Sequence, residues 1–153
     1  MKSLTAQLSE NRFLRTQHEI TEFRNALNAL KAQSGSQNLG DMFRLFEDSA
    51  KHSPSLEILL DFLFSFDYRE VVSAITQTTP SLISKAPIWL RVIYIRVLAN
   101  ENSKEYLKDI LPTLSDERRL AIYRVLDELS KVDYDDEQVN SDLRQDIEFV
   151  TGK

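Results

Sequence analysis

The chain has 153 residues, no cysteine, three glycines and a formal net charge of −5 at neutral pH. Without cysteine, the sequence excludes disulfides, zinc fingers, iron–sulfur clusters and thiol catalysis. A chain of this length is expected to form one domain, here residues 1–153, that buries roughly two thirds of the surface exposed by the unfolded chain.

The N-terminal third predicts helices separated by one loop. Leu4, Leu8, Phe23 and Leu27 belong to a series of apolar residues at helical steps, and the stretch KAQSGSQNLG contains two of the three glycines. We therefore predict N-terminal helices within residues 1–32, at 4–14 and 16–32, a loop at 33–40, and a main helical stack over 41–153 that begins with a helix at 41–51.

The rest of the chain combines frequent helix-start signals with an absence of glycine between Asp41 and Thr151. Tight β-hairpins and phosphate-binding loops depend on glycine, so neither is expected there. Capping side chains followed by proline or by acidic residues instead predict helix starts. These signals are Ser53 with Pro54, Asp67 with Glu70, Thr79 with Pro80, Asn102 with Glu105, and Ser115.

These patterns predict an all-α fold, with antiparallel helices in a single compact bundle or a short α-solenoid-like stack. Short connections favour antiparallel neighbours, whereas the irregular spacing of tyrosines along the chain does not establish a repeat. The remaining helices are predicted at 54–65, 68–78, 80–84, 87–100, 103–111, 116–132 and 136–150.

The most apolar stretch is APIWLRVIYIRVLAN, residues 86–100, which includes the only tryptophan. A membrane helix needs about 18 to 20 apolar residues with few charges, but this stretch is shorter and contains Arg91 and Arg96. We predict a core helix with Trp89 mostly buried, and binding is the alternative. At least one arginine should then lie near a carboxylate of a neighbouring helix. The candidate carboxylates, in the part of the chain before this stretch, are Glu57, Asp61, Asp67 and Glu70.

No catalytic or metal-binding pattern is evident. His18 with Glu22, and His52 with Asp48, have four-residue helical spacing, but each pair offers two ligands where a stable zinc site uses three or four. The serines and carboxylates lack a glycine elbow or a partnering base. We therefore expect no enzymatic activity, no cofactor, no metal and no small-molecule substrate.

The net negative charge of the chain belongs to its C-terminal part. Residues 1–114 contain 13 acidic and 13 basic side chains, whereas residues 115–153 contain 11 acidic and 6 basic ones. This acidic segment is either a solvated helix start or a docking surface for a basic partner. Direct nucleic-acid binding is not expected, because it needs clusters of Lys and Arg. The candidate partner-binding residues are Asp133, Tyr134, Asp135, Asp136, Glu137, Asp142 and Asp146.

Pro87, Trp89, Arg96, Leu98 and Asn100 in the apolar stretch resemble a motif of the immunity protein 30 family. The similarity extends over roughly residues 55–130. It implies a small helical protein that binds a toxin delivered between competing bacteria, by contact-dependent growth inhibition or another polymorphic toxin system. The resemblance together with the acidic charge favours a nuclease toxin, blocked by stoichiometric occlusion of its active site, because nuclease clefts are basic.

Other functions remain open on the sequence alone. A helical adaptor or scaffold in a resident cytoplasmic complex is the main alternative, and a regulatory enzyme subunit without chemistry of its own is a third. The N-terminal segment lacks the order of a signal peptide, and no span long enough for a membrane occurs, so we expect a cytoplasmic protein. If the C-terminal acidic segment is not the interface, acidic residues near helix starts are the next candidates. These are Asp41, Asp48, Asp67 and Glu70.

Overall fold

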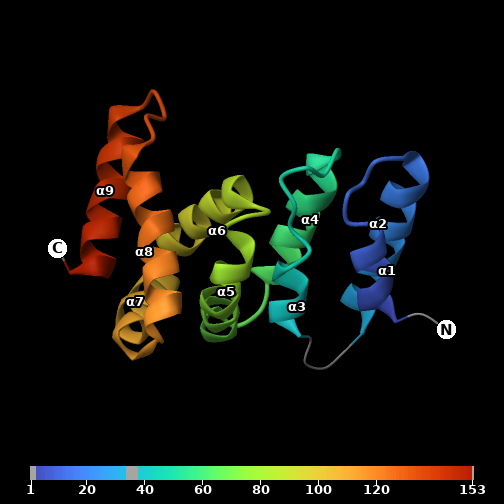
Figure 1. Cartoon of the computed structure of the whole chain (residues 1–153), viewed down its shortest axis with the longest axis horizontal. Coiled ribbons are helices and arrows are strands. Elements are labelled where there is room, and N and C mark those ends of the chain that lie inside the picture. The colour runs from blue at the N-terminus through green and yellow to red at the C-terminus, as the bar shows by residue number, and fades with distance from the viewer. Residues whose placement is uncertain (1–2, 34–37, 153) are drawn as a thin grey trace. The chain divides into compact units, whose positions relative to one another are not determined.

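A computed structural model describes residues 3–33 and 38–152, and every regular element within them is helical (Figure 1). The all-α prediction is therefore confirmed. The helices are α1 (Leu4–Glu10), α2 (Gln17–Ala32), α3 (Leu39–Phe43), α4 (Ser53–Leu63), α5 (Tyr68–Leu82), α6 (Pro87–Ala99), α7 (Glu101–Ile110), the 3-10 turn η1 (Leu111–Thr113), α8 (Asp116–Lys131) and α9 (Glu137–Thr151).

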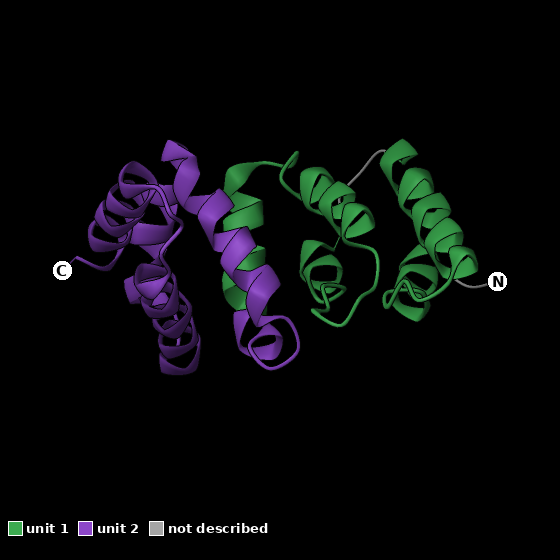
Figure 2. Cartoon of the chain, turned by 90° about the horizontal axis from the view of Figure 1, so that it is seen from above, with its two compact units in different colours: residues 1–78 green, residues 79–153 purple. Residues whose placement is uncertain are grey.

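The chain forms two compact units, Met1–Thr78 and Thr79–Lys153, shown in green and purple in Figure 2. The boundary falls within α5, so one helix contributes residues to both units. The assignment of residues 1–153 to a single domain stays a prediction.

In unit 1, α1 packs against α2, and α4 packs against both α2 and α3. Its core is made of apolar side chains, mainly leucine and phenylalanine, among them Leu8, Phe23 and Leu59, which are 0% exposed. Phe43 stacks near Phe46 with ring centroids 6.4 Å apart. The first unit is therefore stabilised by burial of large apolar side chains, without disulfides.

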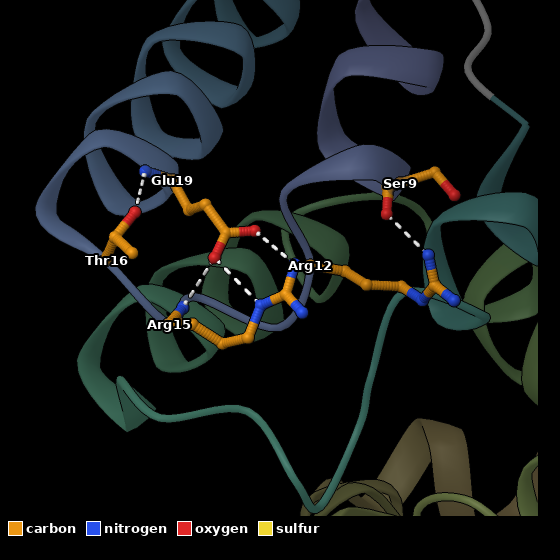
Figure 3. Close-up of polar contacts among 5 residues, drawn as sticks. All are labelled: Ser9, Arg12, Arg15, Thr16 and Glu19. Atoms are coloured by element: carbon orange, nitrogen blue, oxygen red, sulfur yellow. Dashed lines mark hydrogen bonds and ion pairs between the residues drawn. The ribbon is translucent and has the colours of Figure 1, made fainter.

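The turn between α1 and α2 is organised by two arginines (Figure 3). Arg12 Nη1 donates to the backbone oxygen of Ser9 at 2.6 Å. Arg15 donates from Nε and Nη2 to the carboxylate of Glu19, at 3.0 and 3.1 Å. Thr16 caps α2 by accepting from the backbone N–H of Glu19 at 3.1 Å. Arg15 and Thr16 therefore act on the same residue and fix the start of α2.

The helix predicted at 41–51 is wrong over most of its length, because α3 ends at Phe43. Tertiary contacts hold the following residues in turns. The Glu47 carboxylate accepts from Arg12 Nε at 3.1 Å, and the backbone N–H of Lys51 donates to the carbonyl of Phe13 at 2.9 Å. Within the predicted loop at 33–40, Asn38 caps a helix that already begins at Leu39, while residues 34–37 lie outside the described part.

The start predicted at Thr79 and Pro80 is also wrong, since α5 continues through Pro80 to Leu82. Thr79 is fully buried, and its hydroxyl shares a 2.6 Å hydrogen bond with the phenol of Tyr94 in place of capping a helix. A proline within a helix removes one backbone hydrogen bond. Burial of Thr79 and Leu82 on either side of it helps to offset that cost.

Other predicted starts are correct or shifted by one or two residues. Ser115 caps α8 by accepting from the backbone N–H of Arg118, and Asp67 accepts from that of Arg69 at the start of α5. The cap of α7 is Asn100, two residues before the predicted Asn102. At α4 the N-cap position falls on His52, one residue before the predicted Ser53.

In unit 2, α6 packs against α7, α8 and α9. Leu90, Ile93 and Val97 are at most 1% exposed, in agreement with the predicted core helix, whereas Trp89 keeps part of its surface exposed. The Nε of Arg91 is buried and has no hydrogen-bond partner within the described residues, so the carboxylate contact expected for the arginines of this helix is not found at Arg91.

Candidate partner-binding site

The seven candidate residues all lie in the connection between α8 and α9 or on α9 itself, within unit 2. Asn140, which is only 3% exposed, holds this connection in place. Asn140 Nδ2 donates to Asp133 Oδ1 at 3.0 Å, and Asn140 Oδ1 accepts from the backbone N–H of Tyr134 at 3.0 Å. Both polar groups of the buried amide are thus used to fix two consecutive loop residues.

Asp133 and Asp136 have structural roles in this connection. Asp133 Oδ1 also accepts from the backbone N–H of Asp135 at 2.9 Å, and the hydrogen bond from Asn140 is the main reason that the pKa of Asp133 lies below its ordinary value. Asp136 caps α9 by accepting from the backbone N–H groups of Gln138 and Val139 at 2.9 and 3.2 Å. For Asp133 and Asp136, two of the four carboxylates in residues 133–137, these contacts support the prediction that the acidic segment is a helix start.

Asp135 and Glu137 are exposed carboxylates with no ion-pair partner among the described residues. Asp135 has a left-handed backbone with φ of 58°, a conformation that Asp and Asn tolerate better than most residues. Their charges are therefore available to an external partner.

An apolar groove lies beside these carboxylates, between α6 and α9, with a volume of about 290 Å³. Tyr134 and Val139, which are 36% and 46% exposed, contribute to its wall. The other apolar lining residues are Ile95, Leu98 and Ala99 from α6 and Leu143 from α9. The polar lining residues are Asp142 and Asp146. The groove is therefore an apolar surface bordered by negative charge.

The two groove carboxylates differ in how far their charge is balanced. Asp146 Oδ1 accepts from Lys104 Nζ at 3.0 Å, and the same ammonium lies 3.2 Å from Glu101 Oε2. The hydrogen bond to Asp146 is the main cause that raises the pKa of Lys104. Asp142 instead accepts from the neutral amide of Gln138 at 2.7 Å, with no lysine or arginine paired to it within the described chain.

The structure thus brings three of the predicted residues together at one groove, namely Tyr134, Asp142 and Asp146. Asp133 and Asp136 shape the loop, and Asp135 and Glu137 extend the acidic surface. Sequence reasoning missed the apolar lining and the buried Asn140. Val139 lies three residues before Asp142 and four before Leu143, so the three share one face of a helix. This spacing could have indicated which face of α9 lines the groove.

A second groove, of about 380 Å³, lies between α8 and α9. It is lined by residues that include Tyr123, Arg144 and Glu148. Arginine and carboxylate side chains occur together there, so no single charge type dominates. The groove between α6 and α9 is the better candidate for a basic partner.

Within the described residues, no group of three or more His, Asp or Glu side chains is arranged to hold a metal ion. No described helix combines the length and apolar character needed to cross a membrane. These two findings do not indicate which molecule the protein binds.

Comparison with known proteins places this chain in a family. The model of the family described as Immunity protein 30 matches residues 10–117, which is more than half of the chain, so the protein belongs to that family. Its class is that of immunity proteins, which act against a toxin. No curated protein and no solved structure matches the chain.

The match also clarifies which parts of the chain the family covers. It begins at residue 10 and so includes α2 and α3, which lie before the segment that carried the sequence resemblance. It ends at residue 117, near the start of α8. The acidic connection and α9 therefore lie outside the matched segment.

Proposed function

We propose that this immunity protein neutralises one cognate polymorphic toxin, such as a toxin of contact-dependent growth inhibition, by binding it stoichiometrically. The toxin is a nuclease with a basic active cleft, and the immunity protein blocks that cleft without catalysis. The complex forms in the cytoplasm, where the nucleic acid to be protected lies.

The observation that supports this proposal most directly is the cluster of unbalanced carboxylates next to exposed apolar surface. Asp135, Glu137 and Asp142 have no cationic partner among the described residues, and Tyr134 and Val139 are exposed beside them. Nuclease clefts bind phosphates and are therefore positively charged. Opposite charges raise the association rate, and tyrosine is enriched among interface hot spots.

The charge distribution supports the same proposal. The net charge of the chain is carried by residues 115–153, and these residues include all seven candidates. A negatively charged surface of the folded protein attracts a positively charged partner and repels nucleic acid. The protein would thus recognise the nuclease without competing for its substrate.

The first test is whether a reading frame immediately upstream of the gene ends in a toxin domain, and the proposal is then tested with that domain. Co-expression should restore growth of cells that produce this domain but not of cells that produce unrelated toxins. With purified proteins, nuclease activity should fall linearly and reach its minimum at one equivalent of immunity protein.

Three results would contradict all or part of the proposal. Equal protection against unrelated toxins would exclude specific neutralisation and favour a general helical adaptor. Binding of the toxin domain with full retention of its nuclease activity would exclude occlusion of the active site. A toxin without nuclease activity would contradict the assignment of its chemistry while leaving the immunity class intact.

A further inference from the structure

We propose that the groove between α6 and α9 receives one apolar side chain of the toxin, presented next to a lysine or arginine that pairs with Asp142. This inference rests on the proposed function, because it names the chemistry of the toxin segment at the same surface. The groove would give the interface with the toxin an apolar anchor site in addition to the attraction between opposite charges.

The lining of the groove favours an apolar occupant. Leu98 and Leu143 form part of the core, whereas Ile95 and Ala99 leave apolar surface accessible on α6 and Val139 does so on α9. Covering such surface with an apolar side chain removes it from water, which is favourable in proportion to the buried area. Hot-spot side chains characteristically fill pockets of this kind near the centre of an interface.

The size and polarity of the groove favour a protein side chain over a metabolite. Its volume of about 290 Å³ lies at or below the lower limit of typical small-molecule sites. Small-molecule sites also contain a few convergent polar groups that fix orientation. Apart from the tyrosine at its wall, this groove offers only the carboxylates of Asp142 and Asp146, so it selects for positive charge and apolar surface but has little means to orient a complex ligand.

Asp142 is the groove carboxylate that can pair with an external cation, because no described lysine or arginine is paired with it. Asp146 already accepts a hydrogen bond from Lys104, which is only 14% exposed at its side chain and remains close to the carboxylate. Asp142 is exposed, and the one hydrogen bond that it accepts within the described part of the chain comes from the amide of Gln138. A lysine or arginine is suited to such a boundary, because its methylene stem covers apolar surface while its charged end reaches the carboxylate.

The wall of the groove is fixed before a partner arrives. The backbone N–H of Tyr134 is bound to the buried Asn140, and the capping contacts of Asp136 fix the first turn of α9 next to Val139. A preformed site avoids part of the ordering cost of association. The arrangement therefore favours an anchor pocket over a surface that forms only on binding.

The first test fills the groove. Ala99→Leu adds an apolar side chain at an exposed position of its wall, so the core is left unchanged. The matched control is Ser141→Leu, which adds the same side chain at an exposed position of α9 that does not line the groove. We expect Ala99→Leu to weaken binding of the purified toxin domain about 10- to 100-fold, the range of a hot-spot contact, and Ser141→Leu to leave it unchanged.

The second test separates local pairing from general attraction. Asp142→Asn removes the groove carboxylate, and Glu148→Gln removes an exposed carboxylate of the same helix outside the groove. Both variants lose one negative charge, so both should slow association slightly. Only Asp142→Asn should also raise the dissociation rate, by about tenfold or more, because truncating a buried charge pair acts mainly on dissociation.

The third measurement locates the contact directly. Methyl groups of Ile95, Leu98 and Val139 should shift in nuclear magnetic resonance spectra when the toxin domain is added. If the toxin binds and cells are protected while these methyl signals stay unchanged and Ala99→Leu has no effect, the groove proposal is wrong and the proposed function stands. If the wild-type protein neither binds nor protects, the proposed function itself fails.

Discussion

The buried amide of Asn140 donates to the carboxylate of Asp133 across seven residues of sequence, with 3.0 Å between Nδ2 and Oδ1. The same side chain accepts from the backbone of Tyr134, so one amide joins the start of the acidic connection to α9. The position of Tyr134 at the candidate groove thus depends on a residue that does not itself line the groove.

Replacing Asn140 should destabilise unit 2 and displace the connection. Asn140→Asp keeps the shape but places a carboxylate next to that of Asp133, and Asn140→Ala leaves a backbone donor without its partner. We expect each change to cost about 1 to 3 kcal/mol of unfolding free energy, the usual cost of an unsatisfied buried polar group. Chemical denaturation measures this cost.

Gln145→Glu is the matched control for Asn140→Asp, because it makes the same amide-to-carboxylate change at an exposed position of α9. It should change the unfolding free energy by less than about 0.5 kcal/mol. Equal effects at the two positions would show that added negative charge, and not loss of the buried contact, lowers stability.

Acid should weaken the connection through Asp133. Its folded-state pKa is below the ordinary value, mainly because Asn140 donates a hydrogen bond to it. A depressed pKa contributes stability that is present above the unfolded pKa, near 4, and that is lost as the pH falls through the folded pKa. Denaturation midpoints measured from neutral pH down to acid should therefore fall less steeply for Asn140→Ala than for the wild type. Parallel curves would contradict the role assigned to this hydrogen bond.

Two arginines of unit 1 should differ in their contribution to stability. The Arg12 side chain is 31% exposed and pairs with that of Glu47, which is 9% exposed, whereas the Arg15 side chain is 62% exposed and pairs with that of Glu19, which is 12% exposed. Arg12→Ala should cost about 1 to 3 kcal/mol, since it removes the hydrogen bonds that Arg12 donates to the buried Glu47 carboxylate and to the carbonyl of Ser9. Arg15→Ala should cost less, because ion pairs of exposed side chains contribute little to stability.

Both arginines also lie near the ring of Phe13, at 4.5 and 5.4 Å from its centroid, so each substitution removes a similar cation–π contact. Because the two carboxylates are similarly buried, the comparison tests the lower exposure of Arg12 together with its additional hydrogen bond to Ser9. Equal losses of unfolding free energy, measured by chemical denaturation, would contradict it.

The elements that were predictable from sequence are those governed by local signals. Pro87 and a continuous apolar run predict α6, and Ser115 followed by two acidic residues predicts α8, because capping and periodicity act over a few neighbouring residues. Both helices begin within one residue of the predicted position.

The errors occur where distant contacts decide the local structure. The helix expected after Asp41 ends early, since Glu47 and Lys51 bind residues near position 12 of the chain. Thr79 does not start a helix, because its hydroxyl is used by Tyr94. At the candidate site, Asp142 and Asp146 were identifiable from their charge, but the groove beside them depends on the packing of α6 against α9, which sequence alone does not give.

Alkali should destabilise unit 2 through Tyr94. This residue is fully buried, and burial raises the pKa of its phenol well above the ordinary value of about 10, despite the hydrogen bond with Thr79. A raised pKa contributes stability that is fully present below the unfolded pKa and lost as the pH rises toward the folded pKa. The unfolding free energy should therefore decline above about pH 10, where the tyrosine ionises in the unfolded chain but not in the folded one.

Tyr94→Phe keeps the buried ring and should cost about 0.5 to 1.5 kcal/mol at neutral pH for the lost hydrogen bond. The decline of the unfolding free energy at alkaline pH should also be shallower in this variant. In the wild type, the phenolate absorbance of Tyr94 should appear only on unfolding, and the variant should lack this component. An unchanged alkaline decline in Tyr94→Phe would show that another group is responsible.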